Sequence, residues 1–572
     1  MTSLGDQLLG MELHNSVFES SVRKLPLPVC AVFGTAESLQ AVSFTTSKQQ
    51  LGTKDGDRVA QAFPQSVSAS GNCVLSPCVS NPNTDQGKRV AVLFSGGPAS
   101  GGHNVICGLK RILGEGNTLL GVRAGPKGLL KGNLAEITTE DVDAIINTGG
   151  FDLLGTDRTK IQSTEQFATV KAVCIKYKID AIVIIGGDDS NTNAAALAEY
   201  LFRDVKPDGS GVQVIGVPKT IDGDLQIGDL LPISFGFDTA TKIYGEMVGN
   251  ILEDARSSLK YWHFIKLMGR SASHVTLEVA LQTKPAFTLI SEEVAKKKLS
   301  LGAIVEQICA TIVARSKNGL NHGVVLIPEG VIEFIPEVRA MIDDLNQAIL
   351  DNAEEFASLH TFAKSMFIRS KLSDANARLL SSLPDDIISV LMADRDAHDN
   401  LQVSLIPTEH LLADMVEARL KEIDPKFPFN SHCHFLGYEG RCGAPTHFDA
   451  AYAYNLGLTA GSLILDGRTG YMATVTGLDK GGTPRALPLT GLIDIERRHG
   501  KEEFVIEKAL VKMDSPAMKF FLSRRDDWAA DDLFTSPGPR QIWGPAADQQ
   551  PISVALNQKS ESLAFRIGPP RA

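Results

Sequence analysis

Residues 181–200, AIVIIGGDDSNTNAAALAEY, decide the fold class, because they read as a buried strand, a glycine turn and a helix in direct succession. The apolar run at 181–185 is rich in β-branched residues and has no polar break, which is typical of a strand buried on both faces. Two glycines and two aspartates follow, and an alanine-rich stretch then favours a helix. Such a strand–turn–helix unit is the building block of a parallel sheet covered by helices.

The same pattern returns along the chain and predicts an α/β fold. Further short apolar runs that read as strands are RVAVLF (89–94), DAIINTGG (143–150) and VQVIGVPKT (212–220), with helical stretches at 104–113, 164–178 and 193–202. A second series contains helices at 238–259 and 273–283 and strands at 261–268, 286–290 and 323–330. Because strands alternate with helices, we expect two parallel sheets in two Rossmann-like three-layer lobes.

Changes in composition divide the chain into six predicted segments. Residues 1–88 are rich in Ser, Gln, Asn and Thr, and residues 337–435 have the charged, periodic texture of helices. The predicted segments are 1–88 (N-terminal extension), 89–234 (first lobe), 235–336 (second lobe), 337–435 (helical insertion), 436–499 (return of the compact core) and 500–572 (C-terminal extension). We predict no site residue in either extension.

Composition argues against several classes of protein. The net charge is −11, from 56 basic and 67 acidic residues, which is unlike a general nucleic-acid binder but allows a local positive pocket for small anions. No run of eighteen apolar residues occurs, so we expect no membrane span. The N-terminus lacks the basic start and apolar core of a secretory signal. With eight scattered cysteines, we expect a cytoplasmic protein with free thiols.

Two predicted strand ends carry glycine-rich loops suited to an anion. In FSGGPASGGHNVI (94–106), backbone N–H groups can approach an oxyanion, and a helix beginning near Gly102 adds a favourable dipole. The loop lacks the ending of a Walker A motif and the spacing of a dinucleotide fingerprint, and packing of strand on helix explains its glycines equally well. In GGFDLLGTDRTK (149–160), Arg158 and Lys160 taken alone read as surface residues. Neither loop by itself identifies a phosphate site.

The other two strand ends carry carboxylates. Asp188 and Asp189 follow the glycines of the opening stretch, and GVPKTIDGDLQ (216–226) places Lys219, Asp222 and Asp224 within six residues. A carboxylate at such a turn can hold Mg²⁺, which proteins usually bind through one or two carboxylates plus substrate phosphates. The alternative is that the aspartates only cap the next helix, a task that Ser190 or Asn191 also suits. If the loops face each other, four carboxylates need cations among them, which predicts a phosphoryl-transfer site.

One further cluster suggests a metal by residue type but not by spacing. It comprises His432, Cys433, His434, Cys442 and His447. These side chains suit zinc, yet no C-x-x-C or H-x-x-x-H pair occurs among them. We therefore favour ordinary pocket or surface residues over a structural metal.

Seven motifs, in order, resemble the phosphofructokinase family. They are SGGPASGGHNVI, GGDDS, PKTIDGD, FGFDTA, MGRSASH, PEG and YEGR, and they span about residues 89–480. GGDDS and PKTIDGD together are similar to the pyrophosphate-dependent branch, and the extra segments 1–88 and 337–435 are similar to its long form. The resemblance implies the phosphofructokinase fold and reversible, Mg²⁺-dependent phosphoryl transfer from pyrophosphate to the 1-hydroxyl of fructose 6-phosphate.

The resemblance also implies why two aspartates stand side by side. ATP-using relatives carry glycine at the positions of Asp189 and Lys219. An added carboxylate would take the space of a nucleotide's α-phosphate and repel its charge, while the lysine can meet the terminal phosphate of pyrophosphate. On this interpretation Asp189 and Lys219 select the donor, and Gly97, Arg158 and Lys160 bind it.

Roles at the reacting atoms follow from the same resemblance. Asp188 is the expected Mg²⁺ ligand, and Asp222 takes the proton from the sugar 1-hydroxyl. An aspartate is a weak base, so aiming the nucleophile matters more than basicity in a loose transition state. Lys219 stabilises the transferred charge, and Asp224 supports the metal or its loop.

The sugar end is implied by the later motifs. The residues expected to contact fructose 6-phosphate are Thr220, Met268, Gly269, Arg270, Glu329, Tyr438 and Arg441. Arg270 is assigned to the phosphate, because a guanidinium suits bidentate recognition, whereas simple packing explains Met268 equally well. Lys260 and Tyr261 are expected to reach in from a second subunit. This implies at least a dimer, of identical chains or with a related subunit.

Three alternatives remain at this point. An ATP-dependent phosphofructokinase would differ in its donor. A non-catalytic regulatory subunit of the same fold would have lost its base or metal ligand, whereas Asp188 and Asp222 are both present. A lipid or NAD kinase with a GGD loop would lack the MGR and YEGR motifs.

Overall fold

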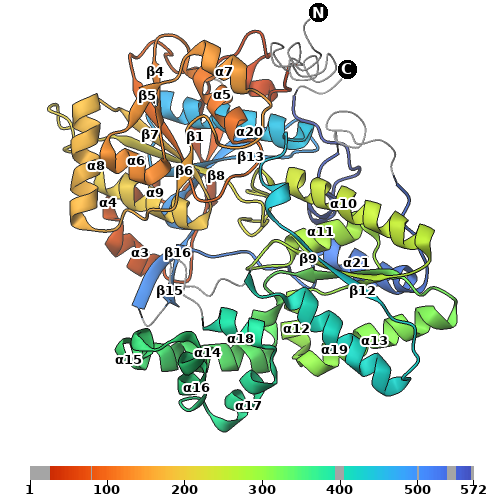
Figure 1. Cartoon of the computed structure of the whole chain (residues 1–572). Coiled ribbons are helices and arrows are strands. Elements are labelled where there is room, and N and C mark those ends of the chain that lie inside the picture. Colours follow the sequence, from red (N-terminus) through yellow and green to blue (C-terminus); the bar gives the residue numbers. More distant parts are fainter. Residues whose placement is uncertain (1–25, 79, 393–404, 499–500, 537–548, 569–572) are drawn as a thin grey trace, which may run out of the picture.

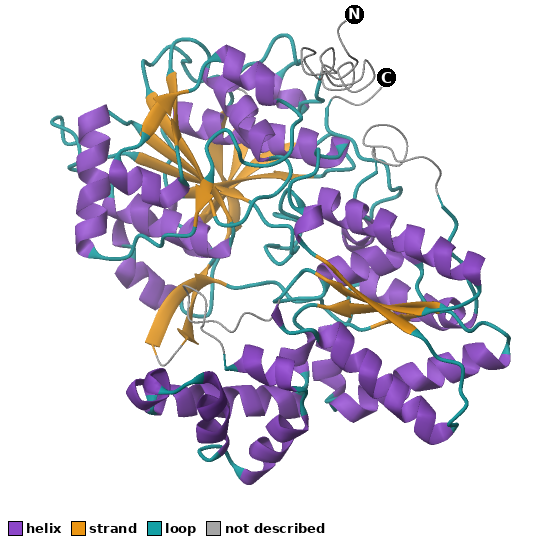
Figure 2. Cartoon of the chain, in the orientation of Figure 1, coloured by secondary structure: helices purple, strands orange, loops and turns teal. Residues whose placement is uncertain are grey.

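The chain forms two α/β lobes around two separate sheets (Figure 1, Figure 2). The computed structural model describes residues 26–78, 80–392, 405–498, 501–536 and 549–568. The large sheet has ten strands in the order β1-β2-β14-β13-β8-β7-β3-β4-β5, with β6 beside β3. Their bounds are β1 Ser43–Gln50, β2 Cys73–Cys78, β3 Arg89–Ser95, β4 Thr118–Val122, β5 Leu134–Glu136, β6 Thr156–Asp157, β7 Ala181–Gly186, β8 Gln213–Pro218, β13 Tyr471–Thr476 and β14 Thr483–Pro488.

The centre of this sheet is parallel, as the sequence predicts. Strands β13, β8, β7, β3 and β4 pair in parallel, whereas the outer strands β5, β14, β2 and β1 pair antiparallel. The predicted N-terminal extension thus contributes two strands to the first lobe. Figure 1 shows that strands from the early part of the chain, drawn in red and orange, lie in the same sheet as strands from its later part, drawn in blue.

Both faces of the large sheet are covered at its centre, which explains why the central strands β3, β7 and β8 are buried along almost their whole length. On β3, Val90 and Val92 enter one core, and Ala91 and Leu93 enter another. The first core holds α5 (Gly102–Leu113) and α20 (His447–Leu465), which pack on each other, and α7 (Thr139–Ile145) beside α5. The second core holds α6 (Gly125–Lys131), α8 (Thr164–Tyr177) and α9 (Asp188–Tyr200), with α3 (Gly56–Ala62) and α4 (Pro64–Ser70) nearby.

The second lobe has a four-stranded parallel sheet in the order β10-β11-β9-β12. The strands are β9 Trp262–Leu267, β10 Phe287–Thr288, β11 Gly323–Pro328 and β12 Ser431–Leu436. Helices α10 (Phe237–Ser258) and α11 (His274–Thr283) cover one face. Helices α12 (Ser291–Lys297), α13 (Leu301–Lys317) and α19 (Thr408–Ile423) lie on the other side of the lobe, with α13 and α19 in the core that holds Trp262 and Phe264.

A compact group of helices packs against the second lobe. It comprises α14 Pro336–Asp351, α15 Ala353–Ser358, α16 Thr361–Arg369, α17 Asp374–Ser382 and α18 Asp385–Leu391. Figure 1 shows them in green, below the second sheet. The predicted insertion, 337–435, is corrected at its C-terminal end: α19 packs on β9 and β12, and β12 itself is a strand of the second sheet.

One predicted strand is a helix. DAIINTGG (143–150) was expected as a strand, but α7 covers its first three residues and the remainder is irregular. A capping box explains the helix, since Thr138 accepts from the backbone N–H of Asp141 and the Asp141 carboxylate accepts from that of Thr138. The strand next to β3 is instead β4, whose apolar run TLLGV is interrupted by glycine.

The C-terminal segment returns to both lobes. Strands β15 (Ile493–Arg498) and β16 (Lys501–Ile506) form a hairpin against α9, and α21 (Pro516–Ala530) and α22 (Ile552–Asn557) pack on α11. Short 3₁₀ turns lie at η1 Ala31–Phe33, η2 Val331–Phe334, η4 Tyr438–Gly440 and η5 Leu489–Gly491. All eight cysteines are free thiols, as expected.

Among the described helices, none taken singly has the length and apolar character to cross a bilayer. Helices α12 and α13 meet that criterion only as a pair, and the chain bends by 116° between them.

Candidate active site

The carboxyl ends of both sheets face one cavity of about 260 Å³. Its lining includes fourteen of the residues predicted for the site: Gly97, Arg158, Lys160, Asp188, Asp189, Lys219, Thr220, Asp222, Asp224, Met268, Arg270, Glu329, Tyr438 and Arg441. We call the loops after β3, β7 and β8 the donor side, and the loops after β9, β11 and β12 the acceptor side. A ligand between the strand ends of two parallel sheets is the usual arrangement in open α/β folds.

The register of the donor-side strands brings their loops together. Gly186 of β7 pairs with Pro218 of β8, so the GGDDS loop and the PKTIDGD loop leave adjacent strands at the same level. On the other side of β7, Ser95 of β3 pairs with Asp157 of β6. Gly96 adopts a φ of 87° and donates its N–H to the Asp157 carbonyl at 3.0 Å. The first glycine loop is therefore held by the segment that carries the predicted basic residues.

Asp188 and Asp189 occupy the first turn of α9 rather than its cap. The cap position is Gly187, and no side chain caps this end of the helix. The predicted capping by Ser190 or Asn191 is therefore wrong, because the helix begins earlier. Asn191 instead donates to the carbonyls of Gly186 and Gly187, both at 2.8 Å. Both aspartates are partly exposed and line the cavity.

Lys219 is a buried cation at the centre of the donor side. Its side chain lies under the first glycine loop, since a Cβ on Gly96 would lie 3.3 Å from Nζ. Burial, with the nearby guanidinium of Arg441, lowers the pKa of Lys219 to about 8. The attraction of Asp222 and Asp188 opposes this shift. A further negative charge in the cavity would stabilise the ammonium form of Lys219 still more.

The PKTIDGD loop is bent so that its carboxylates face the cavity. Asp222 donates its backbone N–H to Thr220 Oγ1 at 3.0 Å, and the Thr220 hydroxyl lies 3.4 Å from Asp224 Oδ1. Gly223 adopts a φ of 72°, and a Cβ there would lie 2.8 Å from the Phe237 ring, so only glycine fits. Burial, followed by the charge of Asp222, raises the pKa of Asp224 to about 7.

The two basic residues of the second loop lie in different surroundings. Arg158 is exposed at the rim of the cavity. Lys160 lines the cavity as well, but its Nζ pairs with Glu503 Oε2 of β16 at 3.0 Å. Of the two, Arg158 therefore has the more accessible charge for an anionic ligand.

On the acceptor side, three adjacent parallel strands end at the predicted sugar motifs. Leu267 of β9 pairs with Pro328 of β11 and with Leu436 of β12, which aligns the MGR, PEG and YEGR segments. Gly269 donates its N–H to Glu329 Oε2 at 2.8 Å and does not itself line the cavity. Burial raises the pKa of Glu329 to about 7. Glu329 thus supports the MGR turn while one face of its carboxyl group borders the cavity.

Arg441 reaches from the acceptor side to the donor side. Its guanidinium lies against Gly97 and 5.3 Å from the ring centroid of Tyr438, which is 68% exposed. The YEGR turn is fixed from behind by Tyr244, whose hydroxyl donates to the Gly437 carbonyl. The sequence placed Arg441 at the sugar phosphate, whereas its guanidinium contacts the glycine loop of the donor side.

Lys260 and Tyr261 lie outside the cavity of their own chain. They precede β9, whereas the MGR turn follows it, so the six-residue strand separates the two by roughly 20 Å. The Tyr261 ring packs on His432 with centroids 4.6 Å apart, and Lys260 Nζ lies 5.0 Å from the Tyr261 ring. Their predicted role in the site of a second subunit stays a prediction.

Lys508, which no sequence pattern indicated, lines the same cavity. It follows β16 in the C-terminal extension, where we predicted no site residue. Its Nζ lies 3.7 Å from Asp224 Oδ2 and 3.9 Å from Asp188 Oδ2. A single lysine in a charged segment has no distinguishing pattern, so only the fold reveals its position.

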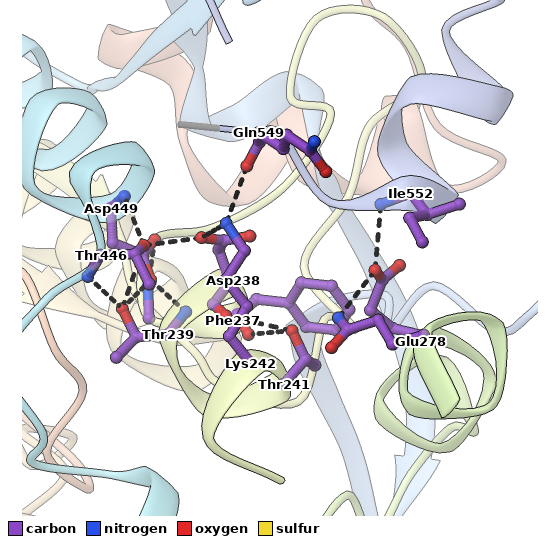
Figure 3. Close-up of polar contacts among 12 residues, drawn as sticks. Phe237, Asp238, Thr239, Thr241, Lys242, Glu278, Thr446, Asp449, Gln549 and Ile552 are labelled. Atoms are coloured by element: carbon purple, nitrogen blue, oxygen red, sulfur yellow. Dashed lines mark hydrogen bonds and ion pairs between the residues drawn. The ribbon is translucent and has the colours of Figure 1, made fainter. Parts of the chain in front are cut away.

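A buried polar network holds the donor side from below (Figure 3). Asp449 of α20 accepts hydrogen bonds from the N–H groups of Gly236 and Thr239, at 3.0 and 2.7 Å, and so caps α10. Gly236 has a φ of 97°, and its Cβ position would lie 2.6 Å from Cβ of Ala99 and 3.3 Å from Ile221. The start of α10 thus supports both the SGGPASGG loop and the PKTIDGD loop.

The same network extends to the C-terminal segment. Asp238 accepts from the Thr446 hydroxyl at 2.6 Å and from Lys242 Nζ at 2.8 Å, and Lys242 also donates to the Gln549 carbonyl. Figure 3 shows these contacts, together with Glu278 accepting from the N–H of Ile552. Burial, followed by the charge of Asp238, raises the pKa of Asp449 to about 7.

The cluster that suggests zinc by residue type does not gather around one point. His432 and His434 lie on β12 beside His263 of β9, and His434 Nε2 is 3.0 Å from His263 Nδ1. Cys442 and His447 lie beyond the YEGR turn. Among the described residues, no group of three or more His, Cys, Asp or Glu side chains is arranged to hold a metal ion alone. A site completed by substrate phosphates would need fewer protein ligands.

Comparison with known proteins places the chain in a family. Residues 89–464 match the family model described as phosphofructokinase. The chain is 47% identical, over 88% of its length and 89% of the relative's, to a protein from Treponema pallidum (strain Nichols) named pyrophosphate–fructose 6-phosphate 1-phosphotransferase. It is 44% identical, over 87% of both chains, to the protein from Arabidopsis thaliana named subunit beta 2 of the same enzyme.

The solved structures agree on the fold. The chain matches the crystal structure of a pyrophosphate-dependent phosphofructokinase from Marinobacter aquaeolei. The match covers 80% of this chain and 96% of the Marinobacter chain, with a TM-score of 0.50 and 16% identity. At that identity the similarity concerns the fold alone, and it agrees with two α/β lobes facing one cavity. With the family match and the sequence relatives, the conclusion is direct: the chain belongs to the phosphofructokinase family.

Proposed function

We propose that the protein catalyses reversible phosphoryl transfer from pyrophosphate to the 1-hydroxyl of fructose 6-phosphate, giving fructose 1,6-bisphosphate and phosphate. One observation carries the proposal: Asp189 and Lys219 both line the donor side of the same cavity that borders the MGR, PEG and YEGR turns. The relatives named for this reaction match most of the chain at 44–47% identity.

The residues of the donor side suit a small, highly charged donor. Backbone N–H groups around Gly97 and the ammonium of Lys219 can bind pyrophosphate oxygens, with Arg158 at the rim. Asp189 adds a negative charge where a nucleotide would carry its α-phosphate, which disfavours ATP. The choice of donor is therefore a difference between attraction and repulsion within one cavity.

The reaction needs few covalent steps from the protein. The sugar oxygen O1 forms a bond to a phosphorus of pyrophosphate while the bond from that phosphorus to the bridging oxygen breaks, and the hydroxyl proton passes to Asp222. Lys219 offsets the charge of the departing phosphate. In such a loose transition state, positioning and charge stabilisation supply most of the rate enhancement.

We further propose Mg²⁺ as the cofactor. Asp188 would hold it, with Asp224 or its loop in support, and hard carboxylate oxygens facing phosphate sites are the ligands this ion prefers. When bound, the ion would neutralise phosphate charge. The partial burial of Asp188 and the burial of Asp224 in one cavity support this assignment.

The sugar phosphate is assigned to the acceptor side. Met268, Arg270 and Glu329 border the cavity there, and Thr220 lies beside the base. Tyr438 lines the cavity on this side as well, and Arg441 reaches from it to the donor-side glycine loop. Lys260 and Tyr261 are proposed to complete the sugar site of a second subunit, so the active form would be at least a dimer. Plant relatives carry names that designate subunits, which supports an assembly of identical or related chains. The cytoplasmic location stays a prediction.

The test compares donors on the purified protein. Formation of fructose 1,6-bisphosphate is followed with pyrophosphate and, separately, with ATP, each with and without a chelator of divalent cations. The proposal predicts turnover with pyrophosphate only, abolished by the chelator and restored by Mg²⁺. Turnover with ATP alone would establish the ATP-dependent alternative, and none with either donor would favour a regulatory subunit.

A further inference from the structure

A short segment after the hairpin crosses from one lobe to the other along the cavity. We call residues 507–511 the strap. At its start the N–H of Ile506 donates to Thr192 Oγ1 of α9, at 3.1 Å. Ala509 then donates its N–H to the Asp224 carbonyl at 2.7 Å. Further on, Val511 donates to Glu292 in the second lobe, at 2.9 Å.

The backbone of the strap is therefore fixed without help from the side chain of Lys508. The carbonyl of Ala509 also lies 2.8 Å from His274 Nε2, which adds a contact to the second lobe. Anchoring the strap is thus no reason to place a long charged side chain at residue 508. The direction of the Lys508 side chain into the cavity therefore needs another explanation.

Lys508 holds a cation between the donor and acceptor sides. Its Nζ donates to Ser271 Oγ at 2.8 Å, directly after the MGR turn, and lies 3.7 and 3.9 Å from carboxylate oxygens of Asp224 and Asp188. Both carboxylate separations exceed hydrogen-bonding distance. The ammonium therefore donates to one neutral hydroxyl and forms longer ion pairs with two carboxylates, between the two sides.

The Lys508 side chain is only 22% exposed and lines the cavity together with Asp188, Asp224 and Arg270. A positive charge between a donor site and a sugar site is what a migrating phosphoryl group requires.

We propose that Lys508 is a further catalytic residue, whose ammonium contacts the phosphoryl group during its transfer. The inference rests on the proposed function. As O1 of the sugar bonds to phosphorus and the bond to the bridging oxygen breaks, negative charge spreads over the three equatorial oxygens. Asp222 receives the hydroxyl proton, so Lys508 contributes charge and no proton. Lys219 stabilises the negative charge of the leaving phosphate, and Lys508 stabilises that of the phosphoryl group being transferred.

Three variants test this role. Lys508→Met keeps the length and apolar stem of the side chain and removes the charge. Lys508→Arg keeps the charge. Lys512→Ala is the matched control, because Lys512 is exposed in the same segment and does not line the cavity. For each, kcat and KM for both substrates, the Tm, and the binding of pyrophosphate by calorimetry are measured.

The proposal predicts that Lys508→Met lowers kcat by about 10²–10³-fold, the range for losing one preorganised stabiliser of a developing oxyanion. Both KM values, the affinity for pyrophosphate and the Tm stay close to those of the wild type, because the interaction is made mainly in the transition state. Lys508→Arg recovers at least about a tenth of the wild-type kcat, since roughly tenfold is the scale of one well-placed charge contact. Lys512→Ala matches the wild type.

Several results would overturn it. A kcat for Lys508→Met within about threefold of the Lys512→Ala value, or a rise in KM at constant kcat, would remove Lys508 from the chemical step. An equal loss in Lys508→Met and Lys508→Arg, with a lower Tm in both, would show that it only supports the strap. If the wild-type protein itself shows no turnover with pyrophosphate, the proposed function fails rather than this residue assignment alone.

Discussion

The guanidinium of Arg441 lies against the backbone of Gly97, so closely that a Cβ on residue 97 would overlap Nη2 of Arg441. Gly97 follows β3 of the first lobe, and Arg441 follows β12 of the second. This contact therefore joins the donor and acceptor sides across the cavity. It also explains why the second glycine of the SGGPASGG loop has no side chain, apart from any need to bind phosphate.

Replacing Gly97 by alanine should displace Arg441 and weaken donor binding. We expect KM for pyrophosphate to rise by about tenfold or more, because each lost charge-assisted contact is worth roughly 1.5–3 kcal/mol. Steady-state kinetics at saturating sugar phosphate measure the effect. Gly56→Ala is the control, since nothing lies within 4 Å of a Cβ at that position. Equal KM values for the two variants would contradict the contact.

Asp222 is assigned as the group that aims the sugar hydroxyl and takes its proton. Asp222→Asn keeps the shape and removes the base, so kcat should fall by about 10²–10⁴-fold with little change in KM. Asp229→Asn, at an exposed position of the following loop, should retain wild-type kinetics. If Asp222→Asn keeps more than about a third of the wild-type kcat, against the losses expected for a base, then another group accepts the proton.

The lowered pKa of Lys219 predicts a pH dependence. In the free enzyme this group is cationic below about pH 8 and neutral above it. Because the ammonium form is the one that binds pyrophosphate, kcat/KM for pyrophosphate should fall as pH rises through about 8. Lys219→Arg stays charged throughout, so its profile, although lower, should be flat in this range. A fall at the same pH in both proteins would assign it to another group.

Asp449 links stability to the site, because it caps α10 next to the SGGPASGG and PKTIDGD loops. Asp449→Ala should lower the free energy of unfolding of the protein by about 2 kcal/mol, the upper range for a lost helix cap, and should also reduce turnover. Urea denaturation followed by circular dichroism, with an activity assay, checks both effects. Ser163→Ala removes the exposed cap of α8 and should lower stability alone. Full activity of Asp449→Ala would contradict the support role.

Much of this site was predictable because it lies at the ends of buried parallel strands. Such strands are apolar throughout and stop at glycine or proline, so β7 and β8 could be located from sequence with the carboxylates that follow them. Adjacent parallel strands end at one edge, and this alone predicts that Asp188 and Asp222 share a site. The MGR and PEG motifs follow the same rule on β9 and β11.

The remaining features depended on tertiary packing. Residues 143–150 read as a short strand that ends at glycine, but a capping box at Thr138 makes residues 143–145 helical. The helical texture of 337–435 concealed β12, whose alternation of histidines with other residues does not read as a buried strand. Lys508 is remote in sequence from Asp224 and Asp188, and only the return of the hairpin to α9 brings it to them.

The central claim is that Asp189 and Lys219 select pyrophosphate over a nucleotide. The direct test is the Asp189→Gly, Lys219→Gly double variant, assayed with pyrophosphate and with ATP at saturating sugar phosphate. We predict that kcat/KM for pyrophosphate falls by at least about 10²-fold, because a buried cation facing the leaving phosphate is lost. Turnover with pyrophosphate equal to that of the wild-type protein would contradict the claim.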